Sequence, residues 1–452
     1  MTGPTSNSRR SWTRRRFFGA ALAGFPPVGL FGRNKTPAAD LAPQTPETKI
    51  KEYRTLGRTG FKVSDVSFGT GGLNNTNILA AALDRGINYI DTAEHYQNGN
   101  AERAIGQVFK TRDRGSVFLT TKLNVTFNKR NSKAEMRDRF MKCLERLGTD
   151  YADCLMIHMC TLAQIKYEPY HELIRELRAE GKVRFSGLSN HGADNSLSGR
   201  LEEPMEDVVL AAAEDGRFDI VLCVFNFLKT ETGERIFQAC RSKNMGITLM
   251  KMNPALTTIE DRETLASYRD RFKAQGKELP EALVKLAKIT EDRAAATEVF
   301  LKKYGLSGPE QTRAAAIKFC LSRPEVHCVC PSINSFEDLH SYIGLSGTRF
   351  TAREANMLAD GKDIYGDLVC RIGCGTCESA CPRRVPVNSI MRFEYYFRAQ
   401  RQEKTAMAEY AGLGTNNAAG CAECPGHCEQ ACPYGVPIQG KLLLAHDRLT
   451  LA

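Results

Sequence analysis

The chain has 452 residues, with 62 Lys and Arg against 52 Asp and Glu. Seven basic residues and a single acid, Asp40, lie in the first 40 residues, so the remainder carries 55 basic and 51 acidic residues, a net charge of +4. This balance gives no indication of nucleic-acid binding, and no 18-residue apolar stretch predicts a membrane span in the mature chain.

The first 32 residues combine a basic lead-in with a short apolar run. Arg14, Arg15 and Arg16 precede two phenylalanines, and the apolar run Gly19–Gly32 is too short and too rich in Gly and Pro to span a bilayer. This pattern resembles a twin-arginine export signal, against the alternative of a solvated basic tail. The resemblance implies a periplasmic protein, or one held at the cell surface or membrane if the signal is retained. Residues 33–50, with three prolines, are expected to form a linker.

Short β-rich runs alternate with amphipathic helical windows from Tyr53 to about Tyr342, and no G-x-G-x-x-G follows the first strand. Such alternation implies parallel strands joined by helices. Eight units predict a (β/α)8 TIM barrel over residues 51–361, followed by a small, mainly helical domain over residues 362–452. The expected strands are Val66–Phe68, Tyr89–Asp91, Val117–Lys122, Cys154–His158, Phe185–Leu188, Ile220–Phe225, Ile247–Lys251 and Cys328–Pro331. The expected helices are Ile78–Arg85, Ala101–Phe109, Lys133–Leu147, Pro169–Glu180, Met205–Asp215, Gly233–Ser242 and Pro309–Leu321.

Four reactive side chains follow or end the early strands of this barrel. Strand two ends at Asp91 and is followed by Tyr96, strand three ends at Lys122, and strand four ends at His158. The carboxyl ends of barrel strands share one rim, where barrel enzymes carry their chemistry. There a Lys lowers the pKa of a Tyr hydroxyl, an Asp holds the Lys, and a His orients a carbonyl. A structural role is the alternative for a single His, but an unpaired buried ammonium is costly.

These residues also carry a resemblance to a known family, the aldo/keto reductases. The motifs are, in order, Tyr53-Arg54-Thr55-Leu56-Gly57-Arg58-Thr59-Gly60, Gly69-Thr70-Gly71-Gly72, Asp91-Thr92-Ala93-x-x-Tyr96, Thr121-Lys122, Ile157-His158 and Gly187-Leu188-Ser189-Asn190. The resemblance implies a catalytic tetrad of Asp91, Tyr96, Lys122 and His158, with Tyr96 as the proton donor. It also implies that Ser189 and Asn190 hold the nicotinamide carboxamide of NAD or NADP.

Several positions depart from that family's pattern. Leu222 stands where the family often has Gln, and Met252 stands where a Tyr stacks on the nicotinamide. After strand eight, the loop that contains Asn334 follows the family's phosphate-loop pattern, but Ser332 and Asp338 replace the usual Lys and Arg. Because an Asp repels a 2′-phosphate, we expect no preference for NADPH.

An insertion of about 55 residues, 254–308, lies between the seventh strand and its helix. It is rich in Lys, Glu and Ala, and we expect it to be helical. Loops of this length on the catalytic rim are usually functional, so it could cover the substrate pocket as a lid.

Eight of the sixteen cysteines lie in the last 83 residues, in two sets that each end in Cys-Pro: Cys370, Cys374, Cys377 and Cys381, then Cys421, Cys424, Cys428 and Cys432. The sets resemble those of iron–sulfur ferredoxins, with one extra residue in each run. All-cysteine zinc sites are the alternative. The resemblance implies two [4Fe–4S] clusters in which the last Cys of each set ligates the other cluster. Residues Val387 to Tyr410, between the sets, are expected to form a helix. The other eight cysteines lack ligand spacing and are expected to be buried hydrophobes.

Two functions remain open from the sequence. The first is an exported, nicotinamide-dependent oxidoreductase that reduces carbonyl compounds or oxidises alcohols and carries iron–sulfur clusters. The alternative is an electron-transfer or docking protein whose barrel is not catalytic and whose clusters pass electrons to a redox partner protein. Hydride transfer moves two electrons and a cluster moves one, so direct coupling needs an intermediate such as a flavin, for which no signature is visible.

Overall fold

The computed structural model describes residues 48–125, 131–192, 203–254, 258–400 and 402–450. Residues 47–452 form one unit, to which this description is limited. The expected twin-arginine signal and most of the linker lie outside the described residues. No described helix is both long enough and apolar enough to cross a membrane.

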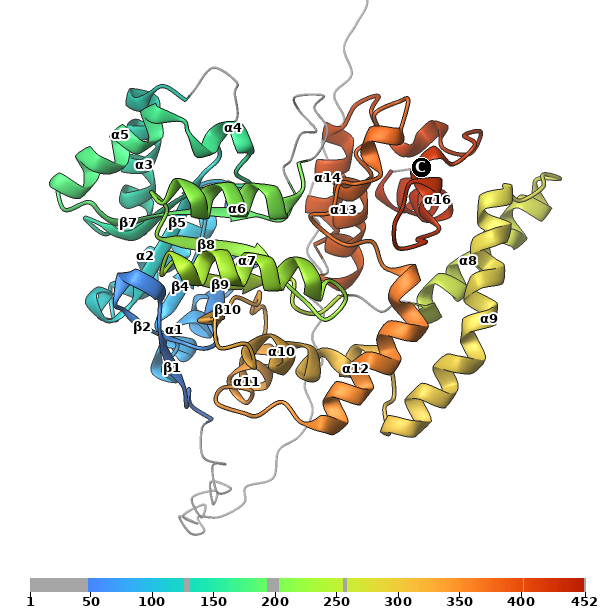
Figure 1. The fold of residues 1–452 in the computed structure, drawn as a ribbon, viewed down its shortest axis with the longest axis horizontal. Helices are drawn as coiled ribbons and strands as arrows, with labels where there is room; N and C mark the ends of the chain where they lie inside the picture. The colour runs from blue at the N-terminus through green and yellow to red at the C-terminus, as the bar shows by residue number, and fades with distance from the viewer. Residues whose placement is uncertain (1–47, 126–130, 193–202, 255–257, 401, 451–452) are drawn as a thin grey trace, which may run out of the picture. The chain divides into compact units, whose positions relative to one another are not determined.

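Eight parallel strands form the centre of the molecule (Figure 1). They pair in sequence order, and β3 also meets β10 through Val66 with Val329 and Gly69 with Ser332, which closes the barrel. The (β/α)8 prediction is therefore confirmed, with most strand ends within two residues of expectation. The strands are β3 (Phe68–Gly69), β4 (Tyr89–Asp91), β5 (Phe118–Leu123), β6 (Ala152–Ile157), β7 (Val183–Asn190), β8 (Ile220–Val224), β9 (Gly246–Met250) and β10 (Cys328–Val329).

Helices on the outside of the strands complete the barrel because each buries an apolar face against them. The α3 helix begins with a capping box between Ser132 and Glu135 and ends at Gly148, which has a left-handed φ. The helices are α1 (Thr76–Asp84), α2 (Asn100–Phe109), α3 (Lys133–Leu147), α4 (Leu162–Ile165), α5 (Glu168–Ala179), α6 (Met205–Asp215), α7 (Thr230–Ser242), α10 (Arg313–Leu321) and α11 (Phe336–Ile343).

An N-terminal hairpin covers the end of the barrel opposite the catalytic rim. Strands β1 (Tyr53–Thr55) and β2 (Lys62–Ser64) pair antiparallel. Gly57 between them has φ +47, and a Cβ there would lie 2.4 Å from the backbone N of Gly246. Only glycine fits so close an approach. The segment Tyr53–Gly60 thus covers the end of the barrel opposite the rim.

The core has two layers, one inside the barrel and one between strands and helices. Inside, the ring of Phe118 lies 5.3 Å from the rings of both Phe61 and Tyr89. Of the eight cysteines outside the two sets, Cys330 is partly buried and the others are buried. They pack as small hydrophobes, as expected.

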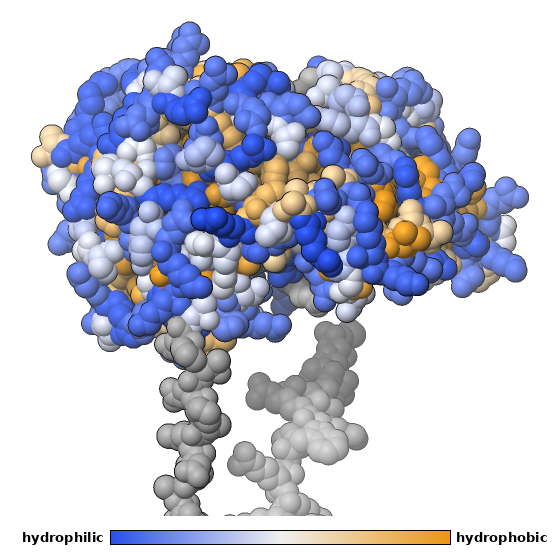
Figure 2. Space-filling view, turned by 60° about the horizontal axis from the view of Figure 1, so that its bottom comes forward, coloured by the Kyte–Doolittle hydropathy of each residue, from blue (hydrophilic) through white to orange (hydrophobic). Residues whose placement is uncertain are grey.

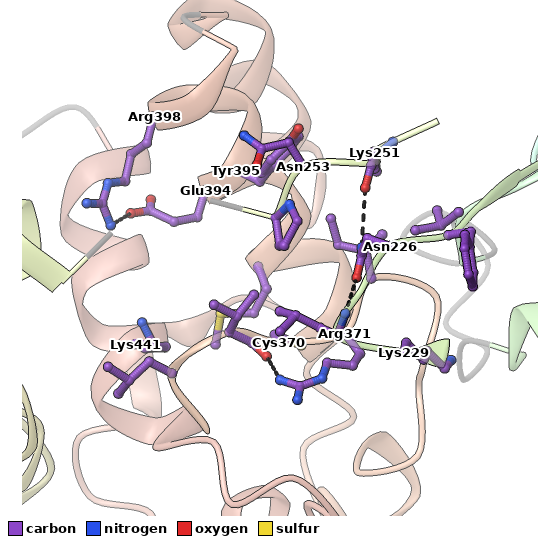
Figure 3. A pocket seen from close by; sticks show the side chains of 18 of the residues that line it. Asn226, Lys229, Lys251, Asn253, Cys370, Arg371, Glu394, Tyr395, Arg398 and Lys441 are labelled. Atoms are coloured by element: carbon purple, nitrogen blue, oxygen red, sulfur yellow. Dashed lines mark hydrogen bonds and ion pairs between the residues drawn. The ribbon is translucent and has the colours of Figure 1, made fainter. Parts of the chain in front are cut away.

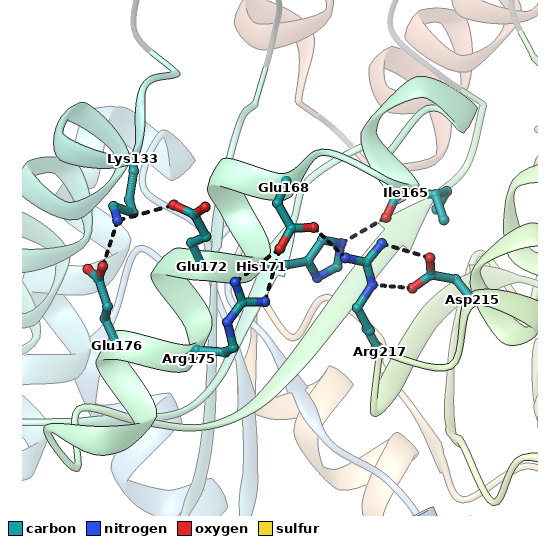
Figure 4. Close-up of polar contacts among 9 residues, drawn as sticks. All are labelled: Lys133, Ile165, Glu168, His171, Glu172, Arg175, Glu176, Asp215 and Arg217. Atoms are coloured by element: carbon teal, nitrogen blue, oxygen red, sulfur yellow. Dashed lines mark hydrogen bonds and ion pairs between the residues drawn. The ribbon is translucent and has the colours of Figure 1, made fainter.

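Ion pairs join the outer helices at the surface (Figure 4). Lys133 of α3 bridges Glu172 at 3.1 Å and Glu176 at 2.7 Å on α5, and Arg217 bridges Glu168 of α5 at 2.8 Å. Exposed pairs of this kind each contribute about 0–1 kcal/mol. They therefore add little to the stability that core packing provides. Figure 2 shows a face on which hydrophilic side chains predominate and hydrophobic ones form separate patches.

The insertion and the C-terminal segment pack together. The insertion contains α8 (Thr258–Ala274) and α9 (Glu281–Tyr304), which pack on each other, and α9 also packs against α12 (Ala352–Tyr365) and α16 (Ile438–Leu449). Leu444 of α16 shares a small apolar core with Leu286 of α9. Because α8 and α9 pack on the C-terminal segment, they do not form the lid over the substrate pocket that was expected (Figure 1).

The C-terminal segment has a core of its own, built from helices and from both cysteine sets. Its remaining helices are α13 (Val387–Ala399), α14 (Glu403–Gly412) and α15 (His427–Gln430). The single helix expected over Val387 to Tyr410 is wrong, since α13 and α14 are separate and pack against each other. Folding back buries the apolar side chains of both helices, which one straight helix would leave exposed.

Candidate active site

The rim at the carboxyl ends of the strands brings the four predicted tetrad residues together. Asp91 ends β4, Lys122 lies near the end of β5, and His158 directly follows β6. Tyr96 begins a short 3-10 helix after β4. The Nζ of Lys122 donates to Asp91 Oδ1 at 2.5 Å and to the carbonyl oxygen of Thr92 at 2.8 Å. A fully buried ammonium is therefore paired, as its burial requires.

Burial and neighbouring charges act in opposite directions on the pKa values of Lys122, Asp91 and Tyr96. Burial disfavours the charged form of Lys122, but Asp91 and Tyr96 together outweigh it and raise the pKa of the ammonium. Burial raises the pKa of Asp91 although Lys122 opposes the rise. Burial likewise raises the pKa of Tyr96 by more than Lys122 lowers it. Lys122 thus acts on the phenol as expected, but the net shift of the phenol's pKa is upward, so Tyr96 holds its proton at neutral pH.

Two histidines contact the ring of Tyr96 and a third extends the group. The ring of His158 lies 5.7 Å from that of Tyr96, that of His95 lies 5.2 Å from it, and the two imidazoles stack at 4.7 Å. The ring of His191 lies 6.4 Å from that of His158. Burial, then the charges of His95 and Lys122, lower the pKa of His158 well below its usual value, so the ring is neutral. Among the described residues, the buried Nδ1 atoms of His158 and His191 have no hydrogen-bond partner. His95 and His191 were not predicted as site residues, although each adjoins a predicted one, Tyr96 and Asn190.

Ser189 and Asn190, for which a contact with the nicotinamide is predicted, lie buried at the end of β7. The hydroxyl oxygen of Ser189 accepts from the backbone N–H of Met159 at 3.3 Å. Asn190 donates to the carbonyl of Cys160 at 2.6 Å and accepts from the N–H of Gly192 at 2.8 Å. An amide side chain has two donors and two lone pairs. One donor hydrogen and one lone pair of Asn190 therefore remain for a carboxamide.

The other predicted nucleotide residues lie after β9 and β10. Met252 is buried. Asn334 Oδ1 is buried and lacks a partner within the described chain, and a Cβ on Gly72 would lie 2.4 Å from it. Asp338 receives the N–H of Asn334 at 3.3 Å and lies 3.8 Å from the guanidinium of Arg313. This loop therefore contains both an unpartnered acceptor and a partly neutralised acid, which the sequence pattern alone did not reveal.

Helix α13 of the C-terminal segment reaches the same rim. Arg392 is 1% exposed and donates to the carbonyl of His191 at 3.5 Å. The ring of Tyr396, one turn further on, lies 5.3 Å from the ammonium of Lys251, which directly follows β9. Arg392 and Tyr396 gave no signal in the sequence, because 201 residues separate Arg392 from His191. The C-terminal segment thus forms part of the wall of the site.

The two cysteine sets come together within the C-terminal core. Four cysteines line one cavity: Cys381, Cys421, Cys424 and Cys428. Cys377 belongs to the same core, and Cys370 and Cys432 pack against it. All sixteen cysteines are free. No three His, Cys, Asp or Glu side chains of the described chain form a group that could hold a single metal ion.

Amide groups point at some of these sulfur atoms. The backbone N–H of Val385 donates to Cys381 Sγ at 3.4 Å, and the side-chain amide of Asn388 donates to Cys370 Sγ at 3.5 Å. Hydrogen bonds to ligating sulfurs are one of the means by which proteins adjust cluster potentials. The cavity that contains Cys381 together with Cys421, Cys424 and Cys428 thus draws its thiols from both sets.

Residues 67–361 match the family model described as the aldo/keto reductase family. The chain is 29% identical over 203 residues to the aldo-keto reductase YhdN of Bacillus subtilis (strain 168), which covers 38% of this chain and 61% of that protein. It is 26% identical over 230 residues to the NADH-specific methylglyoxal reductase of Escherichia coli (strain K12), which covers 44% and 66%. A 32% identical match to the uncharacterized oxidoreductase YqkF of B. subtilis covers 30% of this chain and 48% of that protein, so the chain spans less than two thirds of these relatives.

Among solved structures, the holo form of the aldo-keto reductase AKR11C1 from Bacillus halodurans is similar, with a TM-score of 0.48 and 21% identity. That match covers 69% of this chain and 96% of the other.

Proposed function

The chain belongs to the aldo/keto reductase family and is an oxidoreductase, and from this premise we propose that it reduces carbonyl compounds, or oxidises alcohols, with a bound nicotinamide nucleotide. The observation that carries the proposal is the buried unit of Asp91, Lys122 and Tyr96 beside a neutral His158. Buried ionisable groups at a barrel rim are typical of catalysis rather than of structural support.

Each side chain has a separate task in this proposal. The nicotinamide, when bound, supplies the hydride that reaches the carbonyl carbon. Tyr96 gives its proton to the carbonyl oxygen, so that the product is a neutral alcohol. Lys122 stabilises the phenolate that remains, and Asp91 fixes Lys122. Neutral His158 orients the carbonyl oxygen by a hydrogen bond.

The loop that contains Ser332 and Asn334, with Asp338 after it, supports binding of NADH at least as tight as that of NADPH. Asp338 disfavours a 2′-phosphate, although Arg313 at 3.8 Å offsets part of its charge. A relative is named for its specificity for NADH. Ser332 and Asn334 would contact the nucleotide in the same loop. Both nucleotides thus remain candidates, and the proposal favours NADH.

We further propose that the eight C-terminal cysteines hold two [4Fe–4S] clusters. The cavity lined by Cys381, Cys421, Cys424 and Cys428 supports the crossed ligand sets, in which Cys370, Cys374, Cys377 and Cys432 would hold the other cluster. The clusters, when bound, would pass single electrons. Anaerobically purified protein should contain about eight iron and eight sulfide per chain, whereas stoichiometric zinc without sulfide would reject the clusters.

The proposal also includes export by the twin-arginine route to the periplasm, or to the membrane surface if the signal stays attached. The basic lead-in before Gly19–Gly32 is its only support. That route would suit a protein that receives its clusters in the cytoplasm. A redox partner protein outside the cytoplasm would then exchange electrons with the clusters.

Turnover of Tyr96→Phe tests the catalytic proposal. General acid catalysis is worth about 10²–10⁴-fold, so the variant should lose that much kcat and still bind nucleotide. Tyr53→Phe is the matched control, because the hydroxyl of Tyr53 bonds Gly86 at 2.8 Å on the far hairpin and is remote from the rim. Full turnover in Tyr96→Phe would leave the electron-transfer or docking role as the better account.

A further inference from the structure

The rim carries a second lysine, Lys251, whose surroundings differ from those of Lys122. The ammonium of Lys122 is fully buried and is paired with Asp91 at 2.5 Å. Lys251 directly follows β9, and no carboxylate of the described chain lies within ion-pair distance of it. Its ammonium instead lies 3.7 Å from the sulfur of Met250 and 5.3 Å from the centre of the Tyr396 ring. One lysine of the rim therefore has a partner of opposite charge and the other has none among the described residues.

Cations and uncharged groups surround the ammonium of Lys251. Arg392, one turn before Tyr396 on α13, is 1% exposed and donates to the carbonyl of His191 at 3.5 Å. A guanidinium stays charged, so it disfavours a second positive charge beside it. The titratable or charged groups that act on Lys251, or on which it acts, are Arg392, Tyr396, Lys122, Cys330, His158 and His191.

These surroundings make the amine of Lys251 a weak base. Burial, and then the charge of Arg392, lower the pKa of Lys251 to about 7, with Lys122 adding to the effect and Cys330 opposing it. At pH 7 about half of such an amine is neutral, against about 0.04% of an ordinary lysine with a pKa of about 10.4. The neutral form, which is the nucleophile, is therefore about 10³-fold more abundant at Lys251 than at an ordinary lysine.

The backbone of Lys251 is also held in an unusual conformation. Its φ is +54°, a left-handed value that is uncommon for a residue with a Cβ. The side-chain amide of Asn226 donates to its carbonyl at 3.3 Å, which helps to fix this conformation (Figure 3). Gln97, Asn98 and Met159 have similar φ values and also follow strands at the rim. Such outliers cluster at functional sites, and here they gather where the tetrad lies.

A small molecule can still reach Lys251. The residue is only partly buried, as is Tyr96, so neither is closed off from a molecule bound on the rim. Lysines that are desolvated, or that lie next to another cationic group, are activated as nucleophiles toward carbonyl compounds. Lys251 meets both conditions, whereas the charges of Asp91 and Tyr96 hold Lys122 in its protonated form.

We propose that Lys251 is a nucleophile that forms a reversible imine with aldehydes and ketones bound on the rim. The Nζ atom attacks the carbonyl carbon, a C–N bond forms and the C–O bond breaks. Of the three protons of the ammonium, two leave with the oxygen as water and one stays on the nitrogen, so no oxidant or reductant takes part. The inference takes its class of substrate from the proposed function, but it needs neither nucleotide nor hydride transfer.

Reductive trapping of the imine tests the inference on the full chain without nucleotide. Benzaldehyde and acetaldehyde, each in limiting amount at pH 7, are added in parallel with cyanoborohydride, and the modified lysines are located by mass spectrometry. A weaker base is also a weaker nucleophile, which with the dependence known for thiols leaves about 10- to 100-fold of the 10³-fold gain. At least one aldehyde should therefore modify Lys251 about 10- to 100-fold faster than Lys243, an exposed lysine at the end of α7. Equal or slower modification of Lys251 by both aldehydes would overturn the inference.

Two matched variants show which amine reacts. Lys251→Arg keeps the positive charge but removes the nucleophilic amine, so the fast phase of incorporation should vanish, apart from that of the α-amino group, whose pKa is about 8. Lys243→Arg should keep the fast phase at the native rate. A fast phase that survives in Lys251→Arg belongs to another amine and contradicts the role of Lys251.

The pH dependence of trapping gives a second measurement. The rate at Lys251 should rise up to about pH 7 and then level off, because the amine is neutral above its pKa. The rate at Lys243 should continue to rise toward pH 10, as for an ordinary lysine. A rate at Lys251 that rises in parallel with that at Lys243 would identify an ordinary amine and reject the proposal.

Trapping and turnover together separate this inference from the proposed function. An adduct at Lys251 in a protein that shows no nicotinamide-dependent turnover supports the imine while the proposed reduction fails. Turnover without an adduct at Lys251 overturns the imine and leaves the tetrad as proposed.

Discussion

Replacing Lys122 by Met should damage both the fold and the chemistry. The ammonium is fully buried and lies 2.5 Å from Asp91, which is 3% exposed. Removing one partner of a buried ion pair leaves the other charge uncompensated and costs about 3–5 kcal/mol. We expect a loss of that size in the free energy of unfolding at pH 7, measured by chemical denaturation. Lys133→Met, at an exposed pair with Glu172 and Glu176, should cost at most about 1 kcal/mol.

The pH dependence of this loss has a definite sign. Without Lys122, burial alone acts on the pKa of Asp91, which is raised already in the native protein. A carboxyl whose pKa is higher in the folded than in the unfolded chain stabilises the fold below the unfolded value of about 3.9, and that contribution is lost as pH rises. The deficit of Lys122→Met should therefore be small near pH 4 and grow toward pH 8.

A double variant completes the test. Asp91→Asn combined with Lys122→Met removes both charges, so its stability should lie closer to that of the native protein than Lys122→Met does. Turnover should stay low in the double variant, because the phenolate of Tyr96 still lacks the ammonium. A deficit of Lys122→Met that does not change with pH, or strict additivity of the two substitutions, would refute this account of the pair.

Three further outcomes are expected. Cys381→Ser should lower iron and sulfide by about half and perturb the same electron paramagnetic resonance signal as Cys421→Ser. The control Cys330→Ser should leave metal content and signal at the native level. If Cys381→Ser and Cys421→Ser perturb different signals, the crossed ligand sets are rejected. Asp338→Arg should shift the kcat/KM ratio toward NADPH, and an unchanged ratio would remove Asp338 from the nucleotide site. Replacing Arg14 and Arg15 by Lys should keep the protein in the cytoplasm by fractionation, and the exported native protein should lack indole emission because Trp12 is the only tryptophan. Unchanged export of the Lys variant would contradict the twin-arginine interpretation.

The barrel and the positions of the tetrad residues could be predicted because the geometry of parallel strands determines both. Parallel strands that alternate with helices bring their carboxyl ends to one rim, so Asp91, Lys122 and His158 could be placed together without knowledge of any contact. The crossed ligand sets were implied only by the resemblance to ferredoxins. The structure places Cys381 in one cavity with Cys421, Cys424 and Cys428, and the clusters themselves stay a prediction.

Long-range packing accounts for what the sequence did not predict. Nothing in Val387 to Tyr410 indicates that the chain turns back after α13, or that Arg392 reaches His191. The insertion was expected over the substrate pocket, yet its apolar side chains fit α16, a match of surfaces that no local pattern encodes. The pKa of Tyr96 was expected to fall, but the extent of burial, which raises it, is a property of the folded rim.

The position of α13 connects the cavity of Cys381 and Cys421 to the barrel rim. Its first residue, Val387, lines the cavity of Cys381 and Cys421, and Arg392 and Tyr396 further along the helix meet His191 and Lys251 on the rim. A cluster in that cavity would fix the base of α13 and so hold Arg392 at the tetrad. A cluster bound there would therefore act on the tetrad through the position of α13.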